Sequence, residues 1–131
     1  MARSACKILI IDDNRDGADS TALLLGCMGD YEIRVAYTPE QAHEVARVFL
    51  PDVALMDVGL PGKSGYVLGR ELLDLLPNIR IIALSGHASP EAMRHSIDAG
   101  FDGHLVKPVS PAVLDDEVNN ACQGRQTEAC R

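Results

Sequence analysis

The sequence predicts an α/β domain in which helices enclose a parallel five-stranded sheet as a three-layer sandwich. Short apolar runs alternate with segments of helical periodicity, five of each, and this alternation is typical of right-handed parallel crossovers. The first run, 7–11, is apolar on both faces, as in strands that helices cover on both sides. The chain has 131 residues, the size of one domain, and 47% of them are hydrophobic, enough for a core of its own.

Each predicted strand is a short run of aliphatic residues bounded by turn residues. In chain order, we expect strands at residues 7–11, 32–36, 53–56, 79–84 and 104–106. The run 104–106 is the shortest, and the motif that follows it supports its assignment more than its length does.

Each predicted helix begins at a residue whose side chain can accept hydrogen bonds from the first free N–H groups. In chain order, these residues are Asn14 or Asp13, Thr38, Ser64, Ser89 and Ser110. The second start is the most complete, because Pro39 follows at the first helical position and Gln41 completes a capping box. We expect the domain to span residues 1–123, and residues 124–131 to form a polar tail that frays.

Polar residues stand where the predicted strands end. Asp12 and Asp13 follow the first strand, Asp57 the third, Ser85 the fourth and Lys107 the fifth. The carboxyl ends of parallel strands meet at one edge of the sheet, where open α/β sheets place their ligands. The sequence therefore predicts that these five side chains converge.

This combination of side chains fits phosphoryl transfer. Adjacent carboxylates repel each other unless a cation lies between them, and Mg²⁺ prefers a few carboxylates together with water and phosphate oxygens. Asp57 can then attack phosphorus, while Lys107 and Ser85 stabilise the phosphoryl oxygens. Without this convergence, Asp13 would only cap a helix and Asp12 would be solvated.

Composition excludes several other classes of function. The net charge of −7 argues against a nucleic-acid-binding face. No apolar run approaches 18 residues, and the segment 1–7 lacks the apolar middle of a secretory signal, so we expect a cytoplasmic domain without membrane contact.

The four cysteines lack the CxxC spacing of a zinc site or a clustered disulfide framework. We expect Cys6 and Cys27 to be buried or incidental thiols. We expect Cys122 and Cys130, which flank the polar tail, to be exposed.

Four segments together resemble the receiver domain of two-component response regulators, of the chemotaxis-regulator type. These segments are residues 10–14 (IIDDN), 55–62 (LMDVGLPG), 83–86 (ALSG) and 105–108 (LVKP). The resemblance covers residues 7 to about 121, and it implies a flavodoxin-like (βα)5 fold with strand order 2-1-3-4-5. The segments 12–20 and 100–109 look more like receivers attached to hybrid sensor histidine kinases.

The resemblance also implies roles for individual residues. Asp57 would take a phosphoryl group from a histidine of a kinase or phosphotransfer protein, relaying a signal, with no other enzymatic activity than its own phosphorylation and slow dephosphorylation. Ser85 matches the family's switch hydroxyl, and Lys107 matches its lysine. The implied Mg²⁺ site is made of Asp12, Asp13, Asp57 and the backbone carbonyl of Gly59. An output partner is expected on the face of the fourth helix, fifth strand and fifth helix.

One position departs from the family pattern. The family usually has Tyr or Phe three residues before the lysine, and here that residue is His104. His104 either reports pH, makes a different inward hydrogen bond, or is a partly exposed strand histidine. His87 is expected at the rim, where it either limits the approach of water to the phosphoryl group or is an exposed loop residue.

Three other functions compete with phosphoryl relay. An aspartate-nucleophile phosphohydrolase would need a D-x-D arrangement after its first strand, where this chain has Asp12-Asp13-Asn14. A flavin- or nucleotide-binding module would need a phosphate loop in place of these acids. A docking module that is never phosphorylated remains as the alternative.

Overall fold

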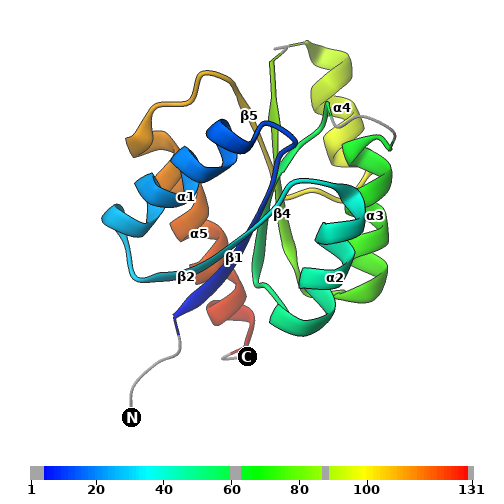
Figure 1. Ribbon diagram of the computed structural model, residues 1–131. Coiled ribbons are helices and arrows are strands. Elements are labelled where there is room, and N and C mark those ends of the chain that lie inside the picture. The colour runs from blue at the N-terminus through cyan, green and yellow to red at the C-terminus, as the bar shows by residue number, and fades with distance from the viewer. Residues whose placement is uncertain (1–4, 60–62, 87–88, 130–131) are drawn as a thin grey trace.

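The structure is a computed structural model that describes residues 5–59, 63–86 and 89–129, with side chains as far as Gln123. Within these residues, five parallel strands form one sheet in the order β2-β1-β3-β4-β5 (Figure 1). The strands are β1 (Cys6–Ile11), β2 (Tyr31–Ala36), β3 (Val53–Asp57), β4 (Arg80–Ser85) and β5 (Gly103–Val106). The helices are α1 (Arg15–Met28), α2 (Pro39–Phe49), α3 (Gly65–Leu75), α4 (Pro90–Asp98) and α5 (Pro111–Ala129). The predicted fold and strand order are confirmed.

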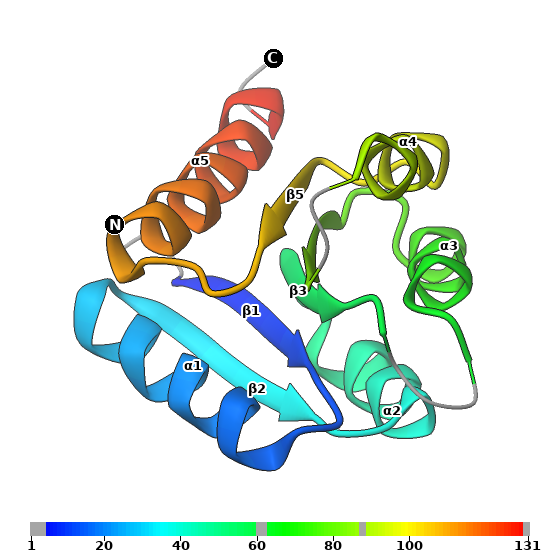
Figure 2. The ribbon, with the colours of Figure 1, turned by 90° about the horizontal axis from the view of Figure 1, so that it is seen from above.

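Helices cover both faces of the sheet and bury a separate core on each (Figure 2). On one face α1 and α5 pack over Ile8 and Ile10 of β1, and on the other α2 and α3 pack over Leu9 and Ile11. Successive side chains of a strand point to opposite faces, so a strand covered on both sides must be apolar throughout. The edge strand β2 differs, because residues 31–35 alternate between half-buried and exposed and only Ala36 at its end is buried.

The starts of the five helices follow the predicted capping chemistry. Asn14, not Asp13, caps α1, because its side chain accepts from the Gly17 N–H at 3.1 Å. At the starts of α2 to α5, one first-turn N–H of each helix donates to a capping side chain, respectively that of Thr38, Ser64, Ser89 and Ser110. The capping box at α2 is shifted, since the Gln41 side chain accepts from the Tyr37 N–H, one residue before the cap.

The C-terminal helix and the cysteines differ from expectation. Helix α5 continues to Ala129, beyond the expected start of the tail at 124, and the domain boundary stays a prediction. Cys6 and Cys122 form a disulfide, so Cys6 is buried as expected but is not a thiol. The expected exposure of Cys122 was wrong, because the residue is 4% exposed. The start of β1 lies beneath α5, a contact between residues 116 positions apart that cysteine spacing cannot reveal.

The other two cysteines take no part in this bond as far as the structure describes them. Cys27 is an exposed free thiol on α1, and Cys130 lies outside the described residues. In the described part of the chain, no helix combines the length and apolar character that a membrane crossing requires.

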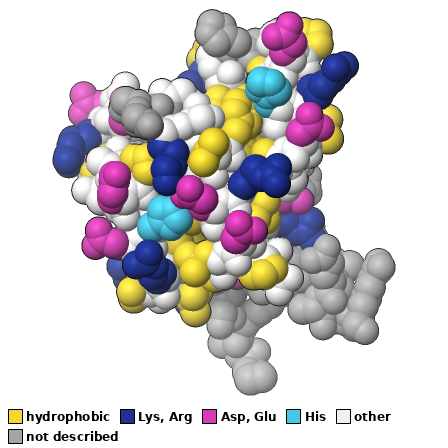
Figure 3. All heavy atoms as spheres, turned by 90° about the vertical axis from the view of Figure 1, so that its right-hand side faces the viewer, with side chains coloured by type: hydrophobic (Ala, Val, Ile, Leu, Met, Phe, Trp, Pro, Cys, Tyr) yellow, Lys and Arg dark blue, Asp and Glu magenta, His cyan; other side chains and the backbone are white. Residues whose placement is uncertain are grey.

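Charged residues on the α2–α3–α4 side are interspersed with apolar ones (Figure 3). Glu71 of α3 accepts hydrogen bonds from Lys63 at 2.8 and 3.0 Å and lies 2.7 Å from the Nε2 atom of His43 on α2. The hydrogen bonds to Lys63 and His43 lower the pKa of Glu71, which keeps this carboxylate ionised. This network connects α2 and α3 to Lys63, which lies between β3 and α3 in the sequence.

Gly69→Ala is expected to lower the free energy of unfolding by about 1–3 kcal/mol. A Cβ atom at Gly69 of α3 would collide with the ring of Phe101, which is buried in the core between α3 and the sheet. Gly26→Ala is the matched control, because the nearest atom to its new Cβ is Ile33 Cδ1 at 4.0 Å. Alanine favours a helix over glycine by up to about 1 kcal/mol, so Gly26→Ala should leave stability unchanged or raise it. Urea unfolding followed by circular dichroism measures both variants, and equal stabilities would contradict the proposed clash.

Candidate functional site

The predicted site residues lie at the carboxyl edge of the sheet. Asp12 directly follows β1, Asp57 and Ser85 are the last residues of β3 and β4, and Lys107 directly follows β5. The parallel register sets these ends side by side, since Asp57 pairs with Leu84 and Ser85 pairs with Val106. A backbone hydrogen bond of 2.7 Å from the Lys107 N–H to the Ser85 carbonyl closes the edge between β4 and β5.

Three carboxylates meet at this edge. Each of Asp12, Asp13 and Asp57 offers an oxygen atom, and these oxygens all lie within 4.8 Å of one another. Asp13 is exposed, Asp57 is half-buried and Asp12 is buried. The two acids that were predicted as neighbours therefore have different environments, and Asp13 does not cap α1.

Lys107 bridges two of these acids. Its Nζ atom lies 3.5 Å from Asp12 Oδ2 and 3.4 Å from Asp57 Oδ2. The Lys107-Pro108 peptide bond is cis, the isomer that the Lys-Pro sequence allowed. The ammonium and the carboxylates therefore converge, as the strand ends predicted.

The electrostatics of Asp12 favour a bound cation. Burial raises the pKa of Asp12, and the nearby Asp57 carboxylate adds to this effect. A hydrogen bond of 3.0 Å from the Asn14 N–H and the charge of Lys107 act in the opposite direction without cancelling it. A second positive charge at this point would relieve the repulsion among the acids. The residues present thus fit a hard divalent cation, which prefers carboxylate oxygens.

The two oxygens of Asp57 have different partners. Oδ1 accepts a hydrogen bond of 2.9 Å from the Gly59 N–H, and Oδ2 faces Lys107. The predicted metal ligand on Gly59 is its carbonyl, and that role stays a prediction.

Sequence reasoning missed Gly65, where a Cβ would come within 2.5 Å of Val58 Cα. Glycine at this position lets α3 start directly against the backbone that follows Asp57.

Ser85 is 4% exposed at the end of β4, which places it at the same edge as Asp57. Its proposed role toward a phosphoryl oxygen remains a prediction. His87, the predicted rim residue, lies outside the described residues.

His104 makes an inward hydrogen bond. Its Nδ1 atom lies 2.7 Å from the hydroxyl oxygen of Ser96 on α4, a residue that is 2% exposed. The Nε2 atom of His104 is buried, and no partner for it is found among the described residues. His104 is thus a half-buried strand histidine that also makes an inward hydrogen bond, and this hydrogen bond links β5 to α4.

Comparison with known proteins identifies relatives over most of the chain. The response regulator receiver domain family matches residues 8–119. The chain is 34% identical over 121 residues to the DNA-binding transcriptional activator DevR/DosR of Mycobacterium tuberculosis, covering 91% of this chain and 55% of that protein. It is 36% identical over 109 residues to the phosphate regulon regulatory protein PhoB of Pseudomonas aeruginosa, covering 82% and 47%. The chain spans about half the length of these curated relatives.

A solved structure is also similar to this chain over most of its length. The CheY-like receiver domain protein of Methanospirillum hungatei superimposes with a TM-score of 0.89 at 31% identity, covering 95% of this chain and 99% of that one. The two chains therefore share one fold over nearly their whole lengths.

Proposed function

This chain belongs to the response regulator receiver domain family, and on that basis we propose that its Asp57 is the phosphoacceptor of a two-component relay. The donor is a phosphohistidine of a histidine kinase or of a histidine phosphotransfer protein. The observation that carries the proposal is the position of the Lys107 ammonium, 3.4 Å from Asp57 Oδ2 and 3.5 Å from Asp12 Oδ2. Such a group can neutralise the charge of a phosphoryl group that arrives at Asp57.

The proposed reaction uses the side chains as they lie. A carboxylate oxygen of Asp57 forms a bond to phosphorus while the N–P bond of phosphohistidine breaks, and the imidazole nitrogen keeps the electron pair. Lys107 exchanges its contact with Asp57 for a phosphoryl oxygen, and the Ser85 hydroxyl donates to another. Slow attack by water on the acyl phosphate returns the free carboxylate.

The acidic residues have a separate proposed role as ligands. Mg²⁺ would be held by Asp12, Asp13, Asp57 and the Gly59 carbonyl, and when bound it supplies positive charge next to the phosphoryl oxygens. The domain acts on itself alone, with phosphorylation and slow dephosphorylation as its only reactions.

The proposal extends to an output partner. Exposed apolar side chains lie on the α4–β5–α5 face, namely Met93 and Ile97 of α4, Val106 of β5 and Val113 of α5. We propose that this face binds the output partner. We place the relay in the cytoplasm, where the ATP that phosphorylates a histidine kinase is found. A docking module that is never phosphorylated is not favoured, because the chain combines the acid cluster with the bridging lysine.

Asp57→Asn is expected to abolish phosphorylation. When the wild-type chain is incubated with acetyl phosphate and Mg²⁺, the intact mass should increase by one phosphoryl group, because the Asp57 carboxylate is the nucleophile. The amide that replaces this carboxylate in the variant is nearly isosteric with it but lacks the charge and the nucleophilic oxygen. An adduct that persists on the variant, or that never forms on the wild type, would refute the assignment. Omission of Mg²⁺ serves as the control for the acid cluster.

A further inference from the structure

Arg15 is held on an aromatic ring beside the acid cluster. It is the first residue of α1 and stands two positions after Asp13. Its Cζ atom lies 4.2 Å from the centroid of the Tyr37 ring. A guanidinium at this distance stacks on the ring and keeps its N–H groups free to bind an anion. The side chain is exposed, so a molecule that approaches the cluster can reach it.

Tyr37 is itself fixed at both ends. Its hydroxyl donates a hydrogen bond of 2.6 Å to Asp19 Oδ1, and its backbone N–H donates one of 2.9 Å to Gln41 Oε1. The hydrogen bond to Asp19 raises the pKa of Tyr37, so the ring remains a neutral phenol. The ring is therefore a firm platform for the guanidinium.

The chain segment that carries Tyr37 lies next to Asp12. The Asp12 N–H donates to the carbonyl of Ala36, the residue before Tyr37, at 3.1 Å. The first turn of α1 also lies against Asp12, because a Cβ built on Gly17 would be 3.6 Å from Asp12 Oδ2. Arg15 and Tyr37 thus belong to the two segments that border Asp12, the first turn of α1 at its carboxylate and the Tyr37 segment at its backbone N–H.

The charge at the site makes an additional cation useful. The three carboxylates, the Lys107 ammonium and one divalent cation together sum to zero. The phosphoryl group of a donor is a dianion, so the filled cluster offers it no net attraction over a distance. A guanidinium at the rim supplies that attraction, and its planar fork fits phosphoryl oxygens in a bidentate manner.

We propose that Arg15, held by Tyr37, binds the anionic phosphoryl group of the incoming donor before it is transferred to Asp57. This inference rests on the proposed function and adds a residue that selects for dianionic donors. The role assigned to Arg15 is donor binding, so it acts mainly on the concentration of donor required and little on the rate of transfer.

The test measures the initial rate of adduct formation on Asp57 against acetyl phosphate concentration, at fixed Mg²⁺. Arg15→Ala should raise the half-saturating concentration about five-fold and leave the maximal rate close to that of the wild type. The variant should also lose part of the dependence of the rate on salt. Arg15→Lys keeps the charge but loses the planar pair of N–H donors. Its half-saturating concentration should lie between those of the wild type and Arg15→Ala.

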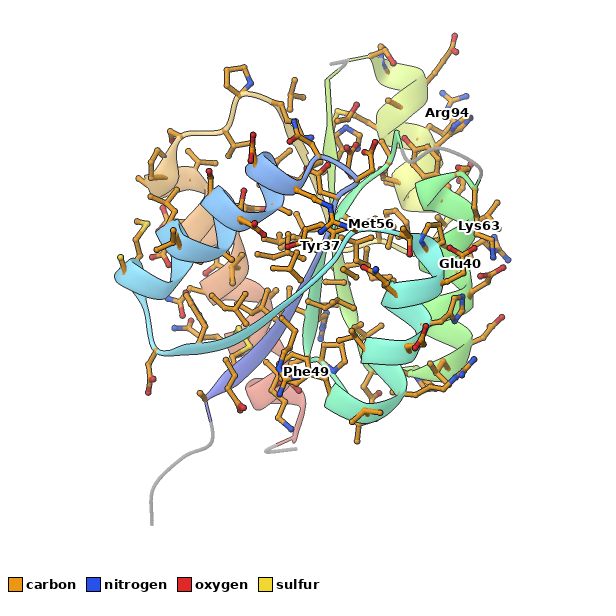
Figure 4. The ribbon with its side chains drawn as sticks, viewed as in Figure 1. Tyr37, Glu40, Phe49, Met56, Lys63 and Arg94 are labelled. Atoms are coloured by element: carbon orange, nitrogen blue, oxygen red, sulfur yellow. A yellow bond between two sulfur atoms is a disulfide. The ribbon has the colours of Figure 1, made fainter. Side chains whose placement is uncertain are left out.

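Arg34→Ala is the matched control. Arg34 is also an exposed arginine stacked on a ring, with its Cζ 5.1 Å from the centroid of Phe49. Phe49 also contacts Lys7 near the start of β1, whereas Tyr37 follows the carboxyl end of β2, and Figure 4 shows the two rings at different levels of the sheet. The variant removes the same charge far from the acid cluster, so its kinetics should match those of the wild type.

The outcomes separate this inference from the function on which it rests. If the wild type forms no adduct, the proposed function fails. If the wild type reacts and Arg15→Ala matches it, or if Arg34→Ala shows the same rise, the role of Arg15 is refuted. A fall in maximal rate without a rise in half-saturating concentration also refutes it. Tyr37→Leu, which keeps the arginine but removes its platform, provides the same comparison should Arg15→Ala fail to fold.

Discussion

Lys107→Ala is expected to lower the rate of Asp57 phosphorylation by acetyl phosphate about 100-fold or more. The Lys107 ammonium lies 3.5 Å from Asp12 Oδ2 and 3.4 Å from Asp57 Oδ2, so it contacts both carboxylates. Removal of one preorganised donor from a site where negative charge develops typically costs a factor of about 100 to 1,000. Time courses of intact mass measure the effect.

Lys63→Ala is the control for this prediction. Lys63 lies 2.8 Å from Glu71 Oε1 on α3, outside the acid cluster, and its loss changes the net charge by the same amount. The phosphorylation rate of Lys63→Ala should remain within about two-fold of the wild type, because a half-exposed ion pair contributes little to stability.

A second measurement for Lys107→Ala is the affinity for Mg²⁺ by calorimetry. Lys107→Ala should bind Mg²⁺ as well as the wild type or better, since a competing cation is gone. If Lys107→Ala reacts at the wild-type rate, or if it reacts slowly only because Mg²⁺ no longer binds, the assigned role is wrong.

Reduction of the Cys6–Cys122 disulfide is expected to lower the free energy of unfolding by about 4–5 kcal/mol. The bond joins residues 116 positions apart, so it closes a loop that includes nearly the whole chain and restricts the unfolded ensemble strongly. Both cysteines are buried, at 6% and 4% exposure, between the start of β1 and α5. Urea unfolding with and without a reducing agent measures the effect without any change of sequence.

Two variants control for other effects of the reductant. Cys6→Ala cannot form the bond, so its unfolding should be the same in both conditions. Cys27→Ser should behave as the wild type, because Cys27 is an exposed free thiol on α1. The prediction fails if reductant leaves the wild type unchanged, or if Cys6→Ala loses as much stability as the wild type does.

The elements of the fold could be predicted because their signals are local. Side chains within three residues of a helix start satisfy its free N–H groups, as Asn14 and Thr38 do here. The burial of residues 53–56 of β3 on both faces follows from a run without polar residues. The acid cluster could also be predicted, although its members are far apart in sequence. In a parallel sheet the carboxyl ends of strands share one edge, so residues that end neighbouring strands must meet.

Contacts that depend on how helices pack over the sheet were beyond such reasoning. No spacing rule relates Cys6 to Cys122, because their contact requires α5 to lie over the start of β1. The hydrogen bond between His104 and Ser96 depends on the position of α4 against β5. The stacking of Arg15 on Tyr37 joins α1 to the loop after β2. Local periodicity and capping thus specify the strands, the helices and the edge at which the chemistry occurs. The pairing of side chains between layers is settled only when the whole core packs, because it depends on distances that no neighbour in the sequence controls.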